Sequence, residues 1–70
     1  MTKFLLDIEE FGQVINGTQR IVKRRVQLHP AFGEDRFGNP LSKPQLVEKS
    51  QDLAKTFSGD KLKSSYLHIL

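Results

Sequence analysis

The stretch KFLLDIEEFGQVINGTQRIVKRRVQL, residues 3–28, decides the fold class of this chain of 70 residues. At its centre stands the pair Asn16-Gly17. Glycine in the left-handed conformation ends many helices, so the pair can mark the end of a helix over residues 3–15. The same pair also favours a type I′ turn, which would join the segments on its two sides as a β-hairpin. The two alternatives predict different fold classes.

The apolar residues before this pair favour the helix. Four large side chains recur at spacings of three and four residues: Phe4, Ile8, Phe11 and Ile15. At about 100° per residue they fall within an arc of roughly 60°. Gly12 opposes a helix by about 1 kcal/mol, whereas the hairpin would join apolar residues to polar ones across the strands. We therefore predict a helix over residues 3–15.

Residues 18–28 fit a helix and a strand about equally well. As a helix they place Arg25 among the apolar side chains of one face, and as a strand they place Arg24 there. Pro30 ends either element, because the residue before a proline avoids the helical conformation. This segment therefore stays open between helix and strand.

The clearest element lies at residues 42–58. Ser42 is a good N-cap, Pro44 is tolerated in the first turn, and Gln45 completes a capping box. Gly59 can end the helix in the left-handed conformation. After it, residues 60–70 predict a short terminal helix, with a final strand at the segment YLHIL as the alternative.

Together these elements predict a mainly α, single small domain over residues 1–70, with three or four short helices. A loop at residues 29–41 separates its halves, because two prolines and two glycines in that loop prevent regular structure. The alternative is an α+β domain with a hairpin around Asn16-Gly17.

Composition excludes several classes of protein. The chain has a mass of 8.0 kDa and a formal net charge of +3. It contains no cysteine, which rules out disulfides and cysteine-bound zinc. No apolar run approaches the ~18–20 residues of a membrane span, so a membrane partner is not expected. Asp7 interrupts the first apolar block too early for a signal peptide, so we expect an intracellular, cytoplasmic protein.

Basic residues gather in one short segment that contains no acid. Its four cations are Arg20, Lys23, Arg24 and Arg25. Arginine pairs bidentately with carboxylates and phosphates, so the segment is a candidate site for an acidic protein surface or for nucleic acid. The alternative is a solvated face that pairs with acids near the start of the chain, at Asp7, Glu9 and Glu10.

The loop at residues 29–41 supplies a second candidate contact. It holds Phe32, Arg36 and Phe37 among glycines and prolines. Aromatic residues and arginine are enriched at the cores of interfaces, and loops carry function more often than helices do. The alternative is that both rings fold back and complete the small core.

No pattern of catalysis or metal binding is present. His29 and His68 lie far apart without spaced ligands, and a metal site needs three or four that converge. No phosphate-binding loop, nucleophile elbow or dinucleotide motif occurs. We therefore expect no enzyme, no metal and no cofactor.

These patterns predict a small binding or regulatory module that docks on a larger macromolecular assembly. The basic segment and the aromatic loop would form the contact, and the partner would be a protein or protein complex with an acidic surface. The alternative is a nucleic-acid-binding protein that contacts phosphates through residues 20–25. A homodimer joined by a self-complementary apolar face is a third arrangement.

Overall fold

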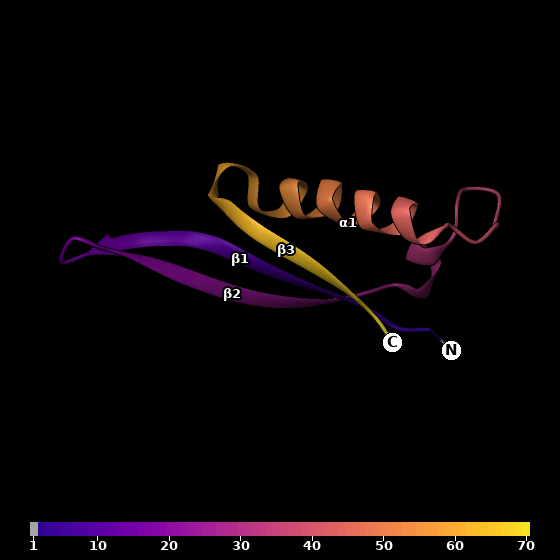
Figure 1. The fold of residues 1–70 in the computed structure, drawn as a ribbon, viewed down its shortest axis with the longest axis horizontal. Helices are drawn as coiled ribbons and strands as arrows, with labels where there is room; N and C mark the ends of the chain where they lie inside the picture. The colour runs from indigo at the N-terminus through magenta and orange to yellow at the C-terminus, as the bar shows by residue number, and fades with distance from the viewer. Residues whose placement is uncertain (1) are drawn as a thin grey trace.

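The computed structural model describes residues 2–70 as an antiparallel sheet with one long helix on it (Figure 1). The long elements are β1 (Phe4–Ile15), β2 (Thr18–Leu28), α1 (Lys43–Ser58) and β3 (Leu62–Ile69). Two short 3-10 helices, η1 (Pro30–Gly33) and η2 (Gly59–Lys61), stand before α1 and β3. The strand order is β2-β1-β3, so the first strand of the chain lies in the middle of the sheet.

The prediction of a mainly α domain is wrong, and so is the description of the protein as helical. The sequence predicts helices over residues 3–15 and 60–70, but these stretches contain β1 and the whole of β3, and the open segment at residues 18–28 forms β2. The reason is that a spacing of four residues, as between Phe4 and Ile8, fits both the helical and the strand period. The sheet uses the strand period and buries Leu6 between them.

The hairpin weighed as the alternative is the connection that forms. Asn16 and Gly17 have φ values of 51° and 77°, the positive values that a two-residue type I′ turn requires. Ile15 then pairs with Thr18. Further along, the pairing shifts by one residue between Phe11 and Val14, which is a β-bulge.

The core lies between α1 and one face of the sheet. Three alternate residues of β1 point into it: Phe4, Leu6 and Ile8. Leu6 and Ile8 are fully buried against Ala54 of α1, while Phe4 packs with Phe32 and Leu46. Burial of each large apolar side chain stabilises the fold by about 1.5–3 kcal/mol before the loss of conformational entropy is counted.

Helix α1 begins and ends at the residues whose chemistry favours caps. The backbone N–H of Ser42 donates to Oε1 of Gln45 at 2.9 Å, which is one half of a capping box. Gly59, with a positive φ of 55°, follows its last residue. The described part of the chain has no helix with the length and apolar character needed to cross a membrane.

The outer half of the β1–β2 hairpin extends beyond α1 (Figure 1). The molecule is therefore elongated, with extents of 49 × 20 × 16 Å. We call residues 11–22 the hairpin tip. Four of its large apolar side chains are exposed: Phe11, Val14, Ile15 and Val22. Helix α1 does not extend over the tip, although Lys61 of η2 lines a hollow beside Phe11 and Val22. The four exposed side chains lie outside the core.

Candidate functional site

The four cations of β2 do not form one patch, because successive side chains of a strand point to opposite faces. Arg24 pairs in register with the buried Ile8 and so lies on the face that carries α1, together with Arg20. Lys23 and Arg25 lie on the open face of the sheet. The sequence therefore places these residues next to each other, but the fold separates them into two pairs.

A row of polar side chains crosses the open face at Asp7. The Arg25 guanidinium donates two hydrogen bonds to the Asp7 carboxylate, at 2.7 and 3.0 Å. His68 Nε2 lies 2.7 Å from the second of these carboxylate oxygens. The hydrogen bonds from Arg25 and then His68 hold the pKa of Asp7 well below its usual range, and Asp7 in turn raises the pKa of Arg25. The row joins all three strands through one carboxylate.

Stability should fall in acid because of Asp7. A lowered pKa means that ionised Asp7 stabilises the folded state fully above its usual value of 3.8, and that this contribution is lost as the pH falls below that value. We expect Asp7→Asn to be less stable than wild type at pH 7 and to lose less stability between pH 4 and pH 2. Urea unfolding at several pH values measures both effects.

The control for this experiment is Asp52→Asn, at a carboxylate of α1 that forms no ion pair within residues 2–70. It should keep the wild-type dependence on pH. An Asp7→Asn protein with an unchanged acid slope would contradict the proposed role of the row.

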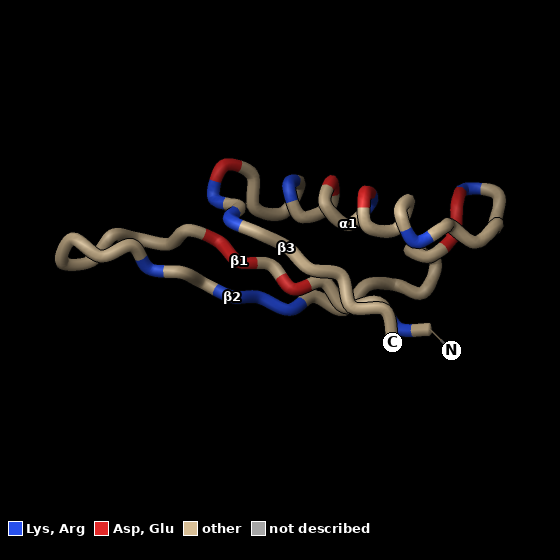
Figure 2. The backbone as a smooth tube through the Cα atoms, viewed as in Figure 1, with Lys and Arg blue, Asp and Glu red and all other residues tan. Residues whose placement is uncertain are grey.

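A second cation of β2 is also paired within the chain. Arg24 Nη1 lies 3.3 Å from Oε1 of Glu10, and the side chain of that glutamate is only 14% exposed. Figure 2 shows the cations of β2 running beside acids of β1. In the described residues, Arg20 and Lys23 form no ion pair. Two of the four predicted contact residues are therefore free to meet a partner without breaking an internal bond.

The loop at residues 29–41 also has one aromatic ring inside the core and one on the surface. Phe32 is buried, its ring centroid lies 5.4 Å from that of Phe4, and Lys49 covers it with Nζ 4.7 Å from the centroid. Phe37 is 75% exposed, and the Arg36 guanidinium stacks 5.0 Å from its ring. Only Arg36 and Phe37 are thus surface residues. Their loop lies at the end of the molecule opposite to the hairpin tip (Figure 1).

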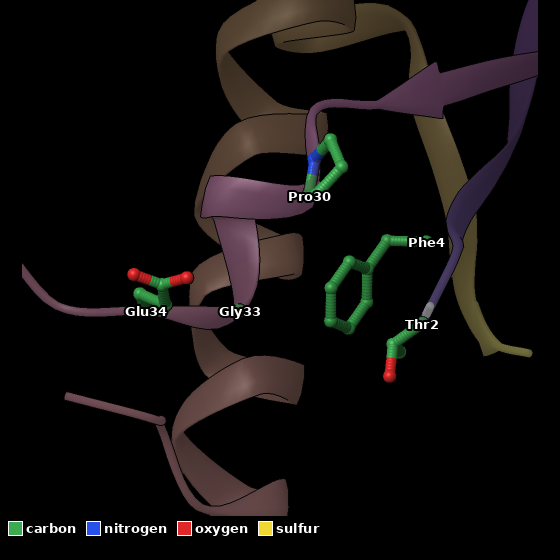
Figure 3. A pocket seen from close by; sticks show the side chains of 5 residues that line it. All are labelled: Thr2, Phe4, Pro30, Gly33 and Glu34. Atoms are coloured by element: carbon green, nitrogen blue, oxygen red, sulfur yellow. The ribbon is translucent and has the colours of Figure 1, made fainter. Parts of the chain in front are cut away.

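A hollow beside Phe4 is lined by residues of η1 and the start of the chain (Figure 3). Its volume is about 260 Å³. The lining residues are Thr2, Phe4, Pro30, Gly33 and Glu34. Glu34 is the one titratable side chain among them, so the hollow does not gather the acid and base groups that proton transfer uses. Residues 2–70 also hold no group of three or more acidic, histidine or cysteine side chains that could bind a metal.

The hairpin tip is the surface that sequence reasoning missed. Phe11 and Ile15 fit the apolar side of the helix predicted over residues 3–15, so the sequence pattern favours a buried position for them. The signal that could have found them is the Asn16-Gly17 turn itself, because apolar residues next to a hairpin turn lie at the end of a ribbon, where no third strand or helix is guaranteed.

Comparisons with protein-family models, with curated proteins and with solved structures found no match for this chain.

Proposed function

We propose that this protein is a non-enzymatic binding module that docks on a larger protein or protein complex through its hairpin tip. The observation that carries the proposal is a ribbon that extends past the helix with four exposed apolar side chains. Val14 is 64% exposed and Ile15 is 49% exposed. By the register of the hairpin, Phe11 and Val14 lie on the open face of the ribbon, and Ile15 and Val22 lie on the opposite face. Exposed apolar residues gathered at one end of a small domain are typical of a contact surface for another protein.

The free cations of β2 support a partner with acidic groups around an apolar centre. Arg20 lies within the tip and Lys23 lies next to it, and neither is paired within the described chain. Opposite charges at the rim of an interface speed association, while buried apolar side chains at its centre supply most of the affinity. Arg24 and Arg25 instead hold β2 to β1.

A protein partner is better supported than nucleic acid. Residues 11–19, which include the turn, carry no charge. A phosphate would have to compete with Glu10 for Arg24 and with Asp7 for Arg25, at contacts of 3.3 and 2.7 Å. Among the described residues, this leaves Arg20 and Lys23 of β2, with Lys61 of η2 beside them, as unpaired cations at the tip. These are too few to make phosphate contacts the main source of affinity.

The test is a pull-down from a lysate of the cells that make this protein. We expect the double variant Val14→Ser, Ile15→Ser to lose the discrete protein bands that wild type recovers, with recovery at least about tenfold lower, since burial of two such side chains is worth more than the 1.4 kcal/mol of a tenfold change. The matched control is Phe37→Ser, an exposed apolar position at the other end of the molecule, which should keep those bands.

Two outcomes would overturn the proposal. One is equal recovery by the double variant and by wild type. The other is recovery that disappears when the lysate is treated with nuclease, which would favour nucleic acid as the partner.

A further inference from the structure

The outer edge of β3 is a row of unpaired backbone groups. Lys3 and Leu70 exchange both backbone hydrogen bonds, at 2.8 and 2.9 Å. In an antiparallel ladder, hydrogen-bonded pairs alternate with pairs that form no hydrogen bond to each other. Ile69, which precedes Leu70, therefore turns its backbone N–H and C=O away from β1, and so does every second residue before it. The residues that face outward are Ser65, Leu67 and Ile69. This edge can form a ladder with one more strand.

A groove runs along this edge beneath α1. Its volume is about 410 Å³. Helix α1 contributes Lys43, Val47, Ser50 and Gln51 to it, and β3 contributes Tyr66 and the three outward residues. Val47 is 39% exposed and Ile69 is 42% exposed. An added strand would therefore meet apolar surface as well as free hydrogen-bonding groups.

The opposite edge of the sheet is unsuitable for such an addition. The outer strand there is β2, which carries four cations in six positions. Charged side chains, lysine in particular, protect edge strands from pairing with other chains. In β3, Lys63 is the one lysine or arginine, and it lies before the outward-facing set. The edge at β3 can therefore pair with another strand, whereas the edge at β2 is protected by its charges.

The charge of the groove indicates which segment fits. Lys43 is the one charged side chain that lines it, and it forms no ion pair within the described residues. It lies at the end of the groove near Ile69 and Leu70. No acid lines the groove. An acidic side chain at that end of an added strand would meet an unpaired cation.

We propose that this groove binds an extended segment of a partner protein as a fourth strand on β3. The segment has about five residues, the length that spans residues 65–69 at roughly 3.4 Å per residue. It runs antiparallel to β3, with an acidic residue first, beside Lys43, and with small apolar side chains at alternate positions that point toward Val47. Backbone hydrogen bonds give affinity in this mode of recognition, and the alternate side chains give specificity. The groove lies apart from the hairpin tip, so this inference is independent of the proposed function.

The probe for this site is the peptide acetyl-Glu-Thr-Val-Thr-Val-amide, titrated into isotope-labelled protein and followed by NMR. We expect the amide signals of the three outward-facing residues to shift and their exchange with solvent to slow. The peptide with lysine in place of glutamate should bind about tenfold more weakly. The variant Lys43→Glu should reverse that preference, whereas Lys55→Glu, on α1 but outside the groove, should not.

The variant Ser65→Pro tests the added ladder directly. Proline removes an N–H that points outward, and it leaves the bonds between β3 and β1 in place. Peptide binding should weaken at least about tenfold, while Ser65→Ala should bind as wild type does. Unchanged binding by the proline variant, or shifts confined to another surface, would overturn the proposal. So would a sedimentation mass of twice 8.0 kDa for the free protein that returns to the monomer value in Ser65→Pro, because a second copy would then occupy the edge.

Discussion

The variant Leu6→Ala is expected to unfold much of the protein at room temperature. Leu6 is the third residue of β1 and has no exposed surface. Removal of a buried leucine side chain costs about 2–5 kcal/mol, which includes the cavity that it leaves. A single core in a domain of this size rarely supplies more than about 3–5 kcal/mol in total. Urea unfolding followed by circular dichroism measures the remaining free energy of unfolding.

The matched control is Val14→Ala on the same strand. Val14 is 64% exposed, and substitutions at exposed positions of this kind usually change stability by no more than about 0.5 kcal/mol. If both variants unfold at the same urea concentration, the burial of Leu6 under α1 is wrong.

The second large effect concerns Gly33, which lies against the ring of Phe4 (Figure 3). A Cβ atom at Gly33 would stand 2.6 Å from Cζ and 2.9 Å from Cε2 of that ring. Such distances force the ring or the backbone of η1 to move, and overpacking of this kind costs about 1–3 kcal/mol. We expect Gly33→Ala to lower the free energy of unfolding by that amount, measured in urea as above.

The double variant separates this contact from other effects of the substitution. Phe4→Leu removes the ring atoms that the new Cβ would meet. In that background Gly33→Ala should cost markedly less than it does in wild type, so the two substitutions should be strongly non-additive. Additive losses would show that the cost arises from the backbone of Gly33 and not from the ring.

Helix α1 could be predicted from the sequence because its signals are local. The capping box of Ser42 and Gln45 and the glycine after the last turn act within a few residues of the chain. These signals depend little on what the helix packs against. A chain reversal at Asn16-Gly17 could also be predicted from the sequence. The same pair can end a helix or connect two strands, and only the structure of the flanking segments distinguishes the two.

The strands could not be assigned from periodicity alone. Phe4 and Ile8 fit both periods, and the bulge near Gly12 breaks the alternation of β1 before the turn. The distribution of charges in the sequence does distinguish the hairpin from the helix. A hairpin turned at Asn16-Gly17 brings the acids of β1 beside the bases of β2, with Asp7 opposite Arg25. Pairs of opposite charge across strands stabilise a sheet, so this complementarity favours the hairpin.

The sequence identifies basic and aromatic residues as candidate contacts. Which of these residues lie on the same surface depends on the sheet. Arg24 and Arg25 are neighbours in sequence, yet the pleat of β2 points them to opposite faces, where each meets an acid of β1. The burial of Phe32 likewise depends on Phe4, which lies far from it in the chain. Such contacts across the fold decide which cations and rings remain available to a partner.

The position of β1 in the middle of the sheet has a consequence for how the protein is made. On the ribosome, β1 and β2 emerge first and can pair as soon as the turn between them is free. The apolar side of that nascent hairpin has no cover until α1 has been translated, and β1 lacks its second neighbour until β3 follows. Chaperones that hold extended apolar segments therefore have their longest opportunity to bind at the strand that later becomes the most deeply enclosed.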